Sequence, residues 1–201
     1  MMVPGYFNPG SICETGDLNI SLTSRQQWVS IENAPSTFIV NATMPRVINN
    51  KVHGFGLILM KESIGLFNNQ MLQIQYSMKK DLFGGKLGMG IQGGLLQQNF
   101  DADKIYIPTS DYHTNTDASI PNGILEGLIP DFSIGVWYNK DKFFSGLSAS
   151  HILESKIKLK SGEENSADTS SYNTYASRTY YLTGGYNIAL TNPLYTLQPS
   201  F

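Results

Sequence analysis

The chain has 201 residues, 15% of them charged, and a formal net charge of −2. A charged fraction well below the roughly 25% of typical soluble domains, with so small a net charge, leaves no electrostatic footprint for nucleic acid. No apolar run approaches the roughly 18 residues of a membrane-spanning helix. Cys13 is the single cysteine, which excludes an internal disulfide and a cysteine-based zinc site.

The first third of the chain predicts three β-strands joined by polar links. Leu18, Ile20 and Leu22 alternate with polar residues, as the side chains of a half-buried strand do. The predicted strands are 17–24, 37–44 (stopped by Pro45) and 53–61. The first two strands are joined by a connection at 25–35 and the next two by a short link at 46–51, and a longer link at 62–70 follows the third strand.

The clearest elements are two alternating segments on either side of a turn at 79–85. Apolar side chains hold one parity: Leu72, Ile74, Tyr76 and Met78 in the first arm, and Leu87, Met89, Ile91 and Leu95 in the second. Because successive strand side chains point to opposite faces, each arm has one apolar face and one polar or glycine-rich face. The pattern predicts an antiparallel hairpin, with arms close to the ~9–11 residues that cross a bilayer as a strand.

The second half continues the alternation around two long polar stretches. The polar stretches are 99–129 and 154–177, and the predicted strands are 130–138, 143–151, 178–188 and the beginning of a ninth at 195–201. When the connections between successive predicted strands are numbered in chain order, the even-numbered ones are short. The fifth and seventh are long, and the first and third are intermediate. Short turns at one rim and longer loops at the other are typical of outer-membrane barrels.

Two architectures fit these strands. In an antiparallel up-and-down transmembrane β-barrel of the outer-membrane type, the apolar face meets lipid and the polar face lines the lumen. In a soluble or surface-attached β-sandwich binding module, the apolar face packs into a core. The sorting of the loops favours the barrel. About eight strands and part of a ninth predict a single barrel domain over residues 1–201, truncated at its C-terminal end, because bacterial single-chain barrels have even strand numbers.

Three possible chemical sites are weak. Residues 88–93 match the dinucleotide fingerprint, but they lie within a strand and no helix follows, so lumen-facing glycines are the better interpretation. Ser148 and His151 miss the nucleophile-elbow spacing. Acidic residues and a histidine in the first long stretch lack the calcium-loop spacing and fit a solvated loop: Asp101, Asp103, Asp111, His113 and Asp117. We therefore expect no catalytic residue, no metal and no cofactor.

Several short motifs follow one another along the chain: Tyr6-Phe-Asn8-Pro9, Arg25-Gln-Gln27-Trp28 with Ala34-Pro35, Ile64-Gly65, Pro130-Asp-Phe with Gly135, Gly146-Leu-Ser-Ala-Ser-His151 and Tyr181-Leu-Thr-Gly-Gly-Tyr186. In this order they resemble the PorP/SprF family of type IX secretion and gliding-motility proteins. The chain departs from the family at 10–16, at 30–33 and in the first long loop, where the acidic-proline element is absent from 111–117.

The resemblance implies a bacterial outer-membrane barrel without enzymatic activity that helps export or anchor secreted surface proteins. Its implied partners are outer-membrane lipid, other type IX secretion components and the C-terminal domains of secreted cargo. The motif residues are the candidates for structural or partner contacts: Asn8, Pro9, Arg25, Gln27, Trp28, Ala34, Pro35 and Gly65. For the 25–35 connection the alternatives are a structural clamp and a surface that receives a secreted partner.

Overall fold

The computed structural model describes residues 4–14, 17–105, 123–161, 172–189 and 196–201. Two short helical turns begin the chain, α1 (Pro4–Phe7) and η1 (Pro9–Cys13), and a third, η2 (Ala102–Lys104), follows the fifth strand. The principal strands are β1 (Asn19–Gln26), β2 (Ser36–Ile48), β3 (Lys51–Ile64), β4 (Phe67–Leu82), β5 (Gly85–Asp101), β6 (Ile124–Lys140), β7 (Phe143–Ser150) and β10 (Thr179–Tyr186). The shorter strands are β8 (Lys156–Ser161), β9 (Tyr172–Tyr175), β11 (Ile188–Ala189) and β12 (Thr196–Leu197).

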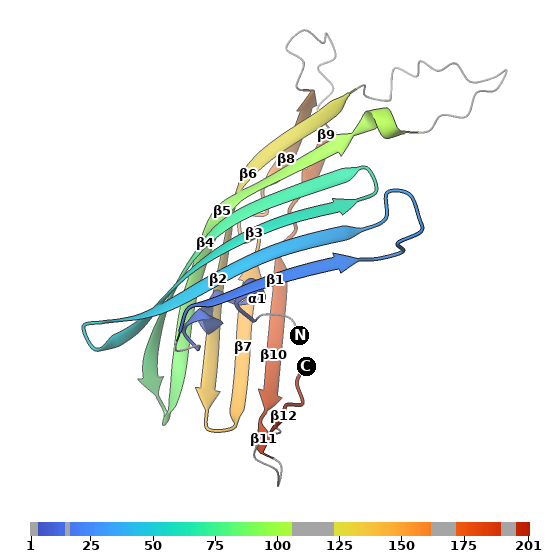
Figure 1. Cartoon of the computed structure of the whole chain (residues 1–201). Coiled ribbons are helices and arrows are strands. Elements are labelled where there is room, and N and C mark those ends of the chain that lie inside the picture. The colour runs from blue at the N-terminus through green and yellow to red at the C-terminus, as the bar shows by residue number, and fades with distance from the viewer. Residues whose placement is uncertain (1–3, 15–16, 106–122, 162–171, 190–195) are drawn as a thin grey trace, which may run out of the picture.

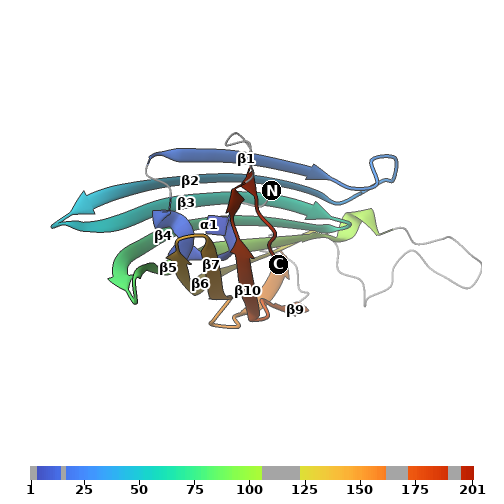
Figure 2. The ribbon, with the colours of Figure 1, turned by 90° about the horizontal axis from the view of Figure 1, so that it is seen from below.

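The principal strands form one antiparallel sheet in the order β1-β2-β3-β4-β5-β6-β7-β10. The sheet curls into a half-barrel, and α1 lies on its concave side (Figures 1 and 2). We call the edge with the β2–β3, β4–β5 and β6–β7 turns the turn rim. The opposite edge, with the β1–β2 and β3–β4 connections, is the loop rim (Figure 1). The predicted fold class, an all-β antiparallel sheet of the outer-membrane barrel type, is confirmed.

The polarity of the two faces is the reverse of a soluble sheet. On the concave, interior face polar side chains are buried, among them Gln73, Gln75 and Ser77. On the convex, exterior face Leu72, Ile74 and Ile91 are 43%, 66% and 59% exposed. The sandwich alternative, which would bury these three side chains between two layers, is therefore wrong.

The strands are longer than their apolar patterns predict. β2 continues through Pro45, which pairs with Gly54, and β6 begins at Ile124 and includes Pro130. Over 61–63 of β3 and 68–70 of β4 both faces of the sheet carry polar side chains, so alternation is lost although pairing continues. Glu62, for example, pairs with Asn69 and accepts a 3.2 Å hydrogen bond from its side chain.

The predicted long link at 62–70 is therefore wrong. Gly65 and Leu66 alone connect β3 to β4. The third connection is as short as the even ones, and the sorting of long connections to one rim rests on the first, fifth and seventh.

The second polar stretch contains two strands that the sequence pattern did not predict. β8 pairs with β6 through Leu125–Ser161 and with β9 through Ile157–Thr174. Inward-facing apolar side chains from β6 and β8 form a small buried core: Leu125, Ile129, Ile157 and Leu159. Charged residues occupy the alternate positions of β8, which made this segment resemble a loop.

At the end of the chain, where the sequence predicts the beginning of a ninth strand, the described residues form a two-residue strand and one isolated bridge. β12 pairs with β11, and the same antiparallel register places Ser200 beside Gly185. Phe201 and Gly184 exchange backbone hydrogen bonds of 3.0 and 3.2 Å. Among the described residues, no helix has the length and apolar character to span a membrane.

Truncating Ile157 should detach the β8–β9 hairpin. Ile157→Ala removes a fully buried side chain and is expected to cost about 2 kcal/mol or more of local stability. Hydrogen exchange of micelle-bound protein should show faster exchange in β8 and β9, with β4 unchanged. Lys158→Ala, the adjacent exposed position, is the control, and equal protection in both variants would contradict the assigned core.

Candidate functional site: the N-terminal segment and the loop rim

The N-terminal segment, residues 4–14, lies against the interior face of the sheet (Figure 2). Asn8 lies between its two helical turns and is 5% exposed. Its side-chain oxygen accepts a 2.9 Å hydrogen bond from Gly10 N, which caps η1. Its side-chain nitrogen donates to the Val136 carbonyl at 2.9 Å. One side chain thus ends one turn, begins the next and ties both to β6.

Glycines on the inward parity make room for this backbone. A Cβ at Gly90 would overlap the Pro9 backbone, and one at Gly135 would overlap the Asn8 side chain. At Gly54 it would stand 2.8 Å from Cys13 Sγ, closer than real contacts allow. Two glycines of the β5 segment that resembles a nucleotide fingerprint, Gly88 and Gly90, therefore face the interior, as predicted, and accommodate a peptide segment of the same chain. The third, Gly93, does not: it has the exterior parity and lies beside the Phe132 ring.

Side chains of the strands supply hydrogen bonds to three carbonyl groups of the segment. Gln75 Nε2 donates to Gly5 O at 2.6 Å, and Ser148 Oγ donates to Phe7 O at 2.7 Å. Ser77 Oγ donates to Gly10 O at 3.4 Å. Because backbone carbonyls withdrawn from water need partners, these donors offset the cost of placing an irregular segment inside the sheet.

A chain of buried polar side chains continues from this contact across the interior. Gln75 Nε2 also donates to Gln92 Oε1 at 2.6 Å, and Gln92 donates to Gln73. Gln73 Nε2 donates to Asp131 Oδ2 at 2.7 Å, while Asp131 Oδ1 lies 2.9 Å from His151 Nδ1. The network links β4, β5 and β6 to the end of β7.

The segment is fixed at its end near the turn rim by ionic and thiol contacts. Glu14 forms a 3.0 Å ion pair with Lys79 and accepts a 2.8 Å hydrogen bond from Asn139. Cys13 is 2% exposed, and its Sγ lies 3.3 Å from Ser77 Oγ. Burial raises the pKa of the Cys13 thiol above its ordinary value and outweighs the opposite effect of Ser77.

The remaining motif residues meet at the loop rim. Gln27 N donates to Pro35 O at 3.0 Å, and this bond closes the β1–β2 connection. Gly65 N donates to Asn33 O at 3.1 Å and joins that connection to the β3–β4 turn. Gly65 has φ +59°, a left-handed conformation that favours glycine. Trp28, also at positive φ, is 67% exposed.

Arg25 lies on β1 opposite Thr37, on the interior parity. With Tyr6, Phe7 and Glu62 it lines an interior groove of about 420 Å³. The structure thus divides the candidate residues into two groups. Asn8 and Pro9 are buried beneath β5 and β6, whereas Gln27, Trp28, Ala34, Pro35 and Gly65 belong to the loop rim.

The residues that hold the segment were not singled out from the sequence. Gln75, Ser77 and Ser148 look like ordinary polar positions of an alternating strand, and their partners are remote in sequence. The spacing of Gly88, Gly90, Gly135 and Gly146 on one parity was the available signal, because glycine in a strand marks close backbone approach.

Within the described residues, Ser148 and His151 of the weak catalytic candidate each have another partner. Ser148 donates to Phe7 O while His151 bonds to Asp131, so no base is aimed at the serine. No group of three or more His, Cys, Asp or Glu side chains in the described ranges could hold a metal. Of the calcium-loop candidates, Asp111, His113 and Asp117 lie outside those ranges.

An antiparallel half-barrel with an apolar convex face and a polar concave face belongs to the outer-membrane class of β-barrels. The model of the type IX secretion system membrane protein PorP/SprF family matches residues 1–201. The chain therefore belongs to the PorP/SprF family. No curated protein and no solved structure matches it significantly.

A side chain at position 90 should release the N-terminal segment from the interior face. The side chain of Gly90→Val would overlap the Pro9 backbone, and Cys13, the single cysteine, reports the displacement. Overpacking of this kind destabilises the docked segment by about 1–3 kcal/mol. We therefore expect maleimide labelling of Cys13 in folded protein to accelerate roughly tenfold. Ile91→Val, the next residue on the exterior face, is the control. Equal labelling rates would show that Gly90 does not hold the segment.

Proposed function

We propose that this protein is a non-enzymatic outer-membrane component of a type IX secretion system that helps export or anchor secreted surface proteins. The observation that carries the proposal is the docking of residues 4–14 on the interior face of the sheet, where side chains of β4 to β7 hold them. A sheet whose concave side is occupied by its own chain is suited to act as a rigid support for loops.

The exterior face supports placement in lipid. Leucine, isoleucine, valine and phenylalanine side chains cover it across β2 to β7, and none of the described elements packs over them. β2 to β6 have 13 to 17 residues, more than the ~9–11 that cross a bilayer. The remaining length would project from the membrane at the rims.

The loop rim supports a role in partner contact. The β1–β2 connection is braced by the Gln27–Pro35 and Asn33–Gly65 hydrogen bonds, yet it exposes Trp28, Val29 and Ile31. Exposed apolar side chains on a rigid loop are typical of recognition surfaces. We propose that this loop contacts other secretion components or the C-terminal domain of cargo, with Arg25 and Ala34 in supporting positions. Asn8 and Pro9 contribute by fixing the interior on which the rim rests.

A charge on the exterior face tests membrane placement. Ile74 is 66% exposed, so Ile74→Lys would be almost neutral in water. In lipid it should cost about 2–4 kcal/mol at the midplane. We expect less folded protein in vesicles and less in the outer-membrane fraction of cells. Val29→Lys on the loop rim is the control. A stable, monomeric fold of the unmodified chain in detergent-free buffer would reject the proposal.

Removing the exposed indole tests the loop rim. Trp28→Ala should leave folding and membrane insertion intact but reduce the amount of secreted surface protein retained on cells several-fold, because interface tryptophans commonly contribute 2 kcal/mol or more. Immunoblots of washed cells and culture medium measure retention. Phe83→Ala, the control, removes an aromatic side chain at the turn rim that is 83% exposed, more than the 67% of Trp28. Equal retention in both variants would assign Trp28 a structural role.

A further inference from the structure

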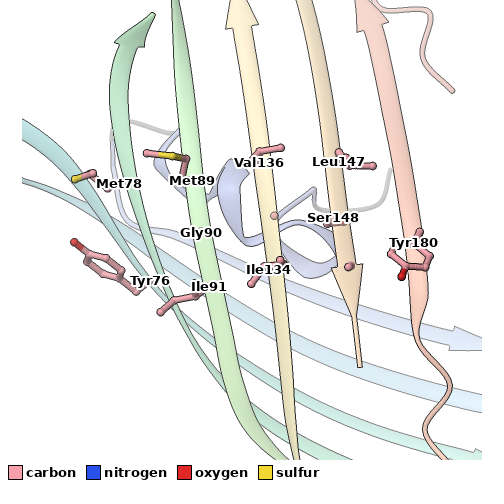
Figure 3. A pocket seen from close by; sticks show the side chains of 12 residues that line it. Tyr76, Met78, Met89, Gly90, Ile91, Ile134, Val136, Leu147, Ser148 and Tyr180 are labelled. Carbon is pink, nitrogen blue, oxygen red and sulfur yellow. The ribbon is translucent and has the colours of Figure 1, made fainter. Parts of the chain in front are cut away.

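An apolar groove of about 600 Å³ crosses the exterior face from β4 to β10. Two rows of side chains form its walls (Figure 3). Met78, Met89, Val136 and Leu147 form one wall, and Tyr76, Ile91, Ile134 and Tyr180 form the other. The floor of the groove is backbone, at Gly90, Gly135 and Ser148. The two glycines have no side chain, and the side chain of Ser148 points to the interior.

Basic residues gather at the β4 end of this groove. In the paired register, Arg46 lies opposite His53, and His53 lies opposite Met78 of the groove wall. His53 Nδ1 lies 2.8 Å from the Tyr76 hydroxyl on the other wall. If that hydroxyl donates, Nε2 carries the hydrogen and can donate to an acceptor outside the protein.

The next exterior positions toward the turn rim add two lysines. Lys51 pairs with Ile48, and Lys80 pairs with Leu87. The strand register brings Lys51 and Lys80 to adjacent positions on β3 and β4, one step beyond the Val52–Lys79 pair. Both lysines are exposed. We call Arg46, Lys51, His53 and Lys80 the basic patch.

In the part of the chain that the structure describes, no acidic side chain lies beside the patch on the same face. Asp81 follows Lys80 but has the opposite strand parity and faces Lys86. The exterior neighbours of the patch on β2 to β5 are Met44, Ile48, Phe55, Tyr76, Met78, Leu87 and Met89. A cluster of cations beside an apolar groove matches a ligand with an anionic head and a hydrocarbon tail.

We propose that this face binds an anionic glycerophospholipid, with its phosphate at the basic patch and one acyl chain in the groove. The proposal rests on the proposed placement of the exterior face in lipid. Barrel strands tilt by about 35–45° from the axis, so a groove that crosses the strands runs obliquely through the membrane, as an acyl chain can. The patch lies near the turn rim, which in outer-membrane barrels faces the periplasm. The occupant would therefore come from the periplasmic leaflet.

Charge complementarity also predicts which lipid is preferred. Lysine and arginine side chains are attracted to anionic lipid head groups, so a phosphatidylglycerol head with net negative charge should bind better than a zwitterionic phosphatidylcholine head. Arginine and the imidazole N–H give directional hydrogen bonds to phosphate oxygens, whereas the lysines contribute point charges.

The test measures lipid binding to the full chain in detergent by native mass spectrometry. We expect the unmodified chain to retain phosphatidylglycerol at least about tenfold better than phosphatidylcholine of the same acyl chains. The combined variant Arg46→Gln, Lys51→Gln and Lys80→Gln should abolish this preference. The control variant Lys156→Gln, Lys158→Gln and Lys160→Gln makes the same charge change on β8 and should retain it.

Two further experiments test the contributions of the lipid's acyl chain and head group separately. Ala149 lines the groove, so Ala149→Phe should reduce retention of phosphatidylglycerol several-fold without changing charge. Inorganic phosphate at the same concentration should not displace the lipid, and displacement would overturn the acyl-chain assignment.

Failure of the site is distinguishable from failure of membrane placement. Equal retention of both lipids by a chain that inserts into vesicles would overturn the site alone. So would equal loss of preference in the two triple variants. A chain that does not insert into vesicles at all would overturn the proposed function, and the lipid site with it.

Discussion

The close approach of the N-terminal backbone to β5 and β6 is the contact on which the interior depends. The segment can lie there only because two conditions are met together. Gly90 and Gly135 leave space where a Cβ would collide, and Gln75 and Ser148 donate to carbonyls that would otherwise be buried without partners. Space without donors would bury unpaired carbonyl groups, and donors without space would meet a steric barrier.

The same alternation of residues gives the exterior its different chemistry. Over 72–78 of β4 and 87–91 of β5, alternate positions turn outward with leucine, isoleucine, tyrosine or methionine, and the positions between them turn inward with glutamine, serine or glycine. The sheet thus presents hydrocarbon to one side and hydrogen-bonding groups to the other. A sheet in water would turn its polar face outward, whereas a sheet in lipid turns its apolar face outward. The burial of Gln73 and the exposure of Ile74 therefore indicate that the exterior face is suited to lipid.

The sequence predicted the fold where apolar and polar residues alternate along a strand, and it failed where this alternation is absent. Over 72–78 and 87–91 one face is apolar throughout, so the two strands, the presence of a turn between them and the direction in which each face points were predictable. Toward the loop rim, Glu62 and Asn69 pair across strands with polar side chains on both faces, and the pattern could not distinguish a paired strand from a loop. β8 was hidden for a related reason, because its lysines outnumber Ile157 and Leu159. The N-terminal segment was recognisable as a motif, but its location depends on contacts with Val136 and Ser148, 128 and 141 residues away.

That separation has a consequence for the order of folding. The segment around Asn8 has nowhere to dock until β6 and β7 are paired, so its contacts form after the wall and not before it. Contacts between residues so distant in sequence carry a large loop-closure cost and slow the final step. Until docking, the inward glycines and glutamines face solvent, and the nascent sheet is a hydrated trough. Docking of the N-terminal segment then covers these glycines and glutamines.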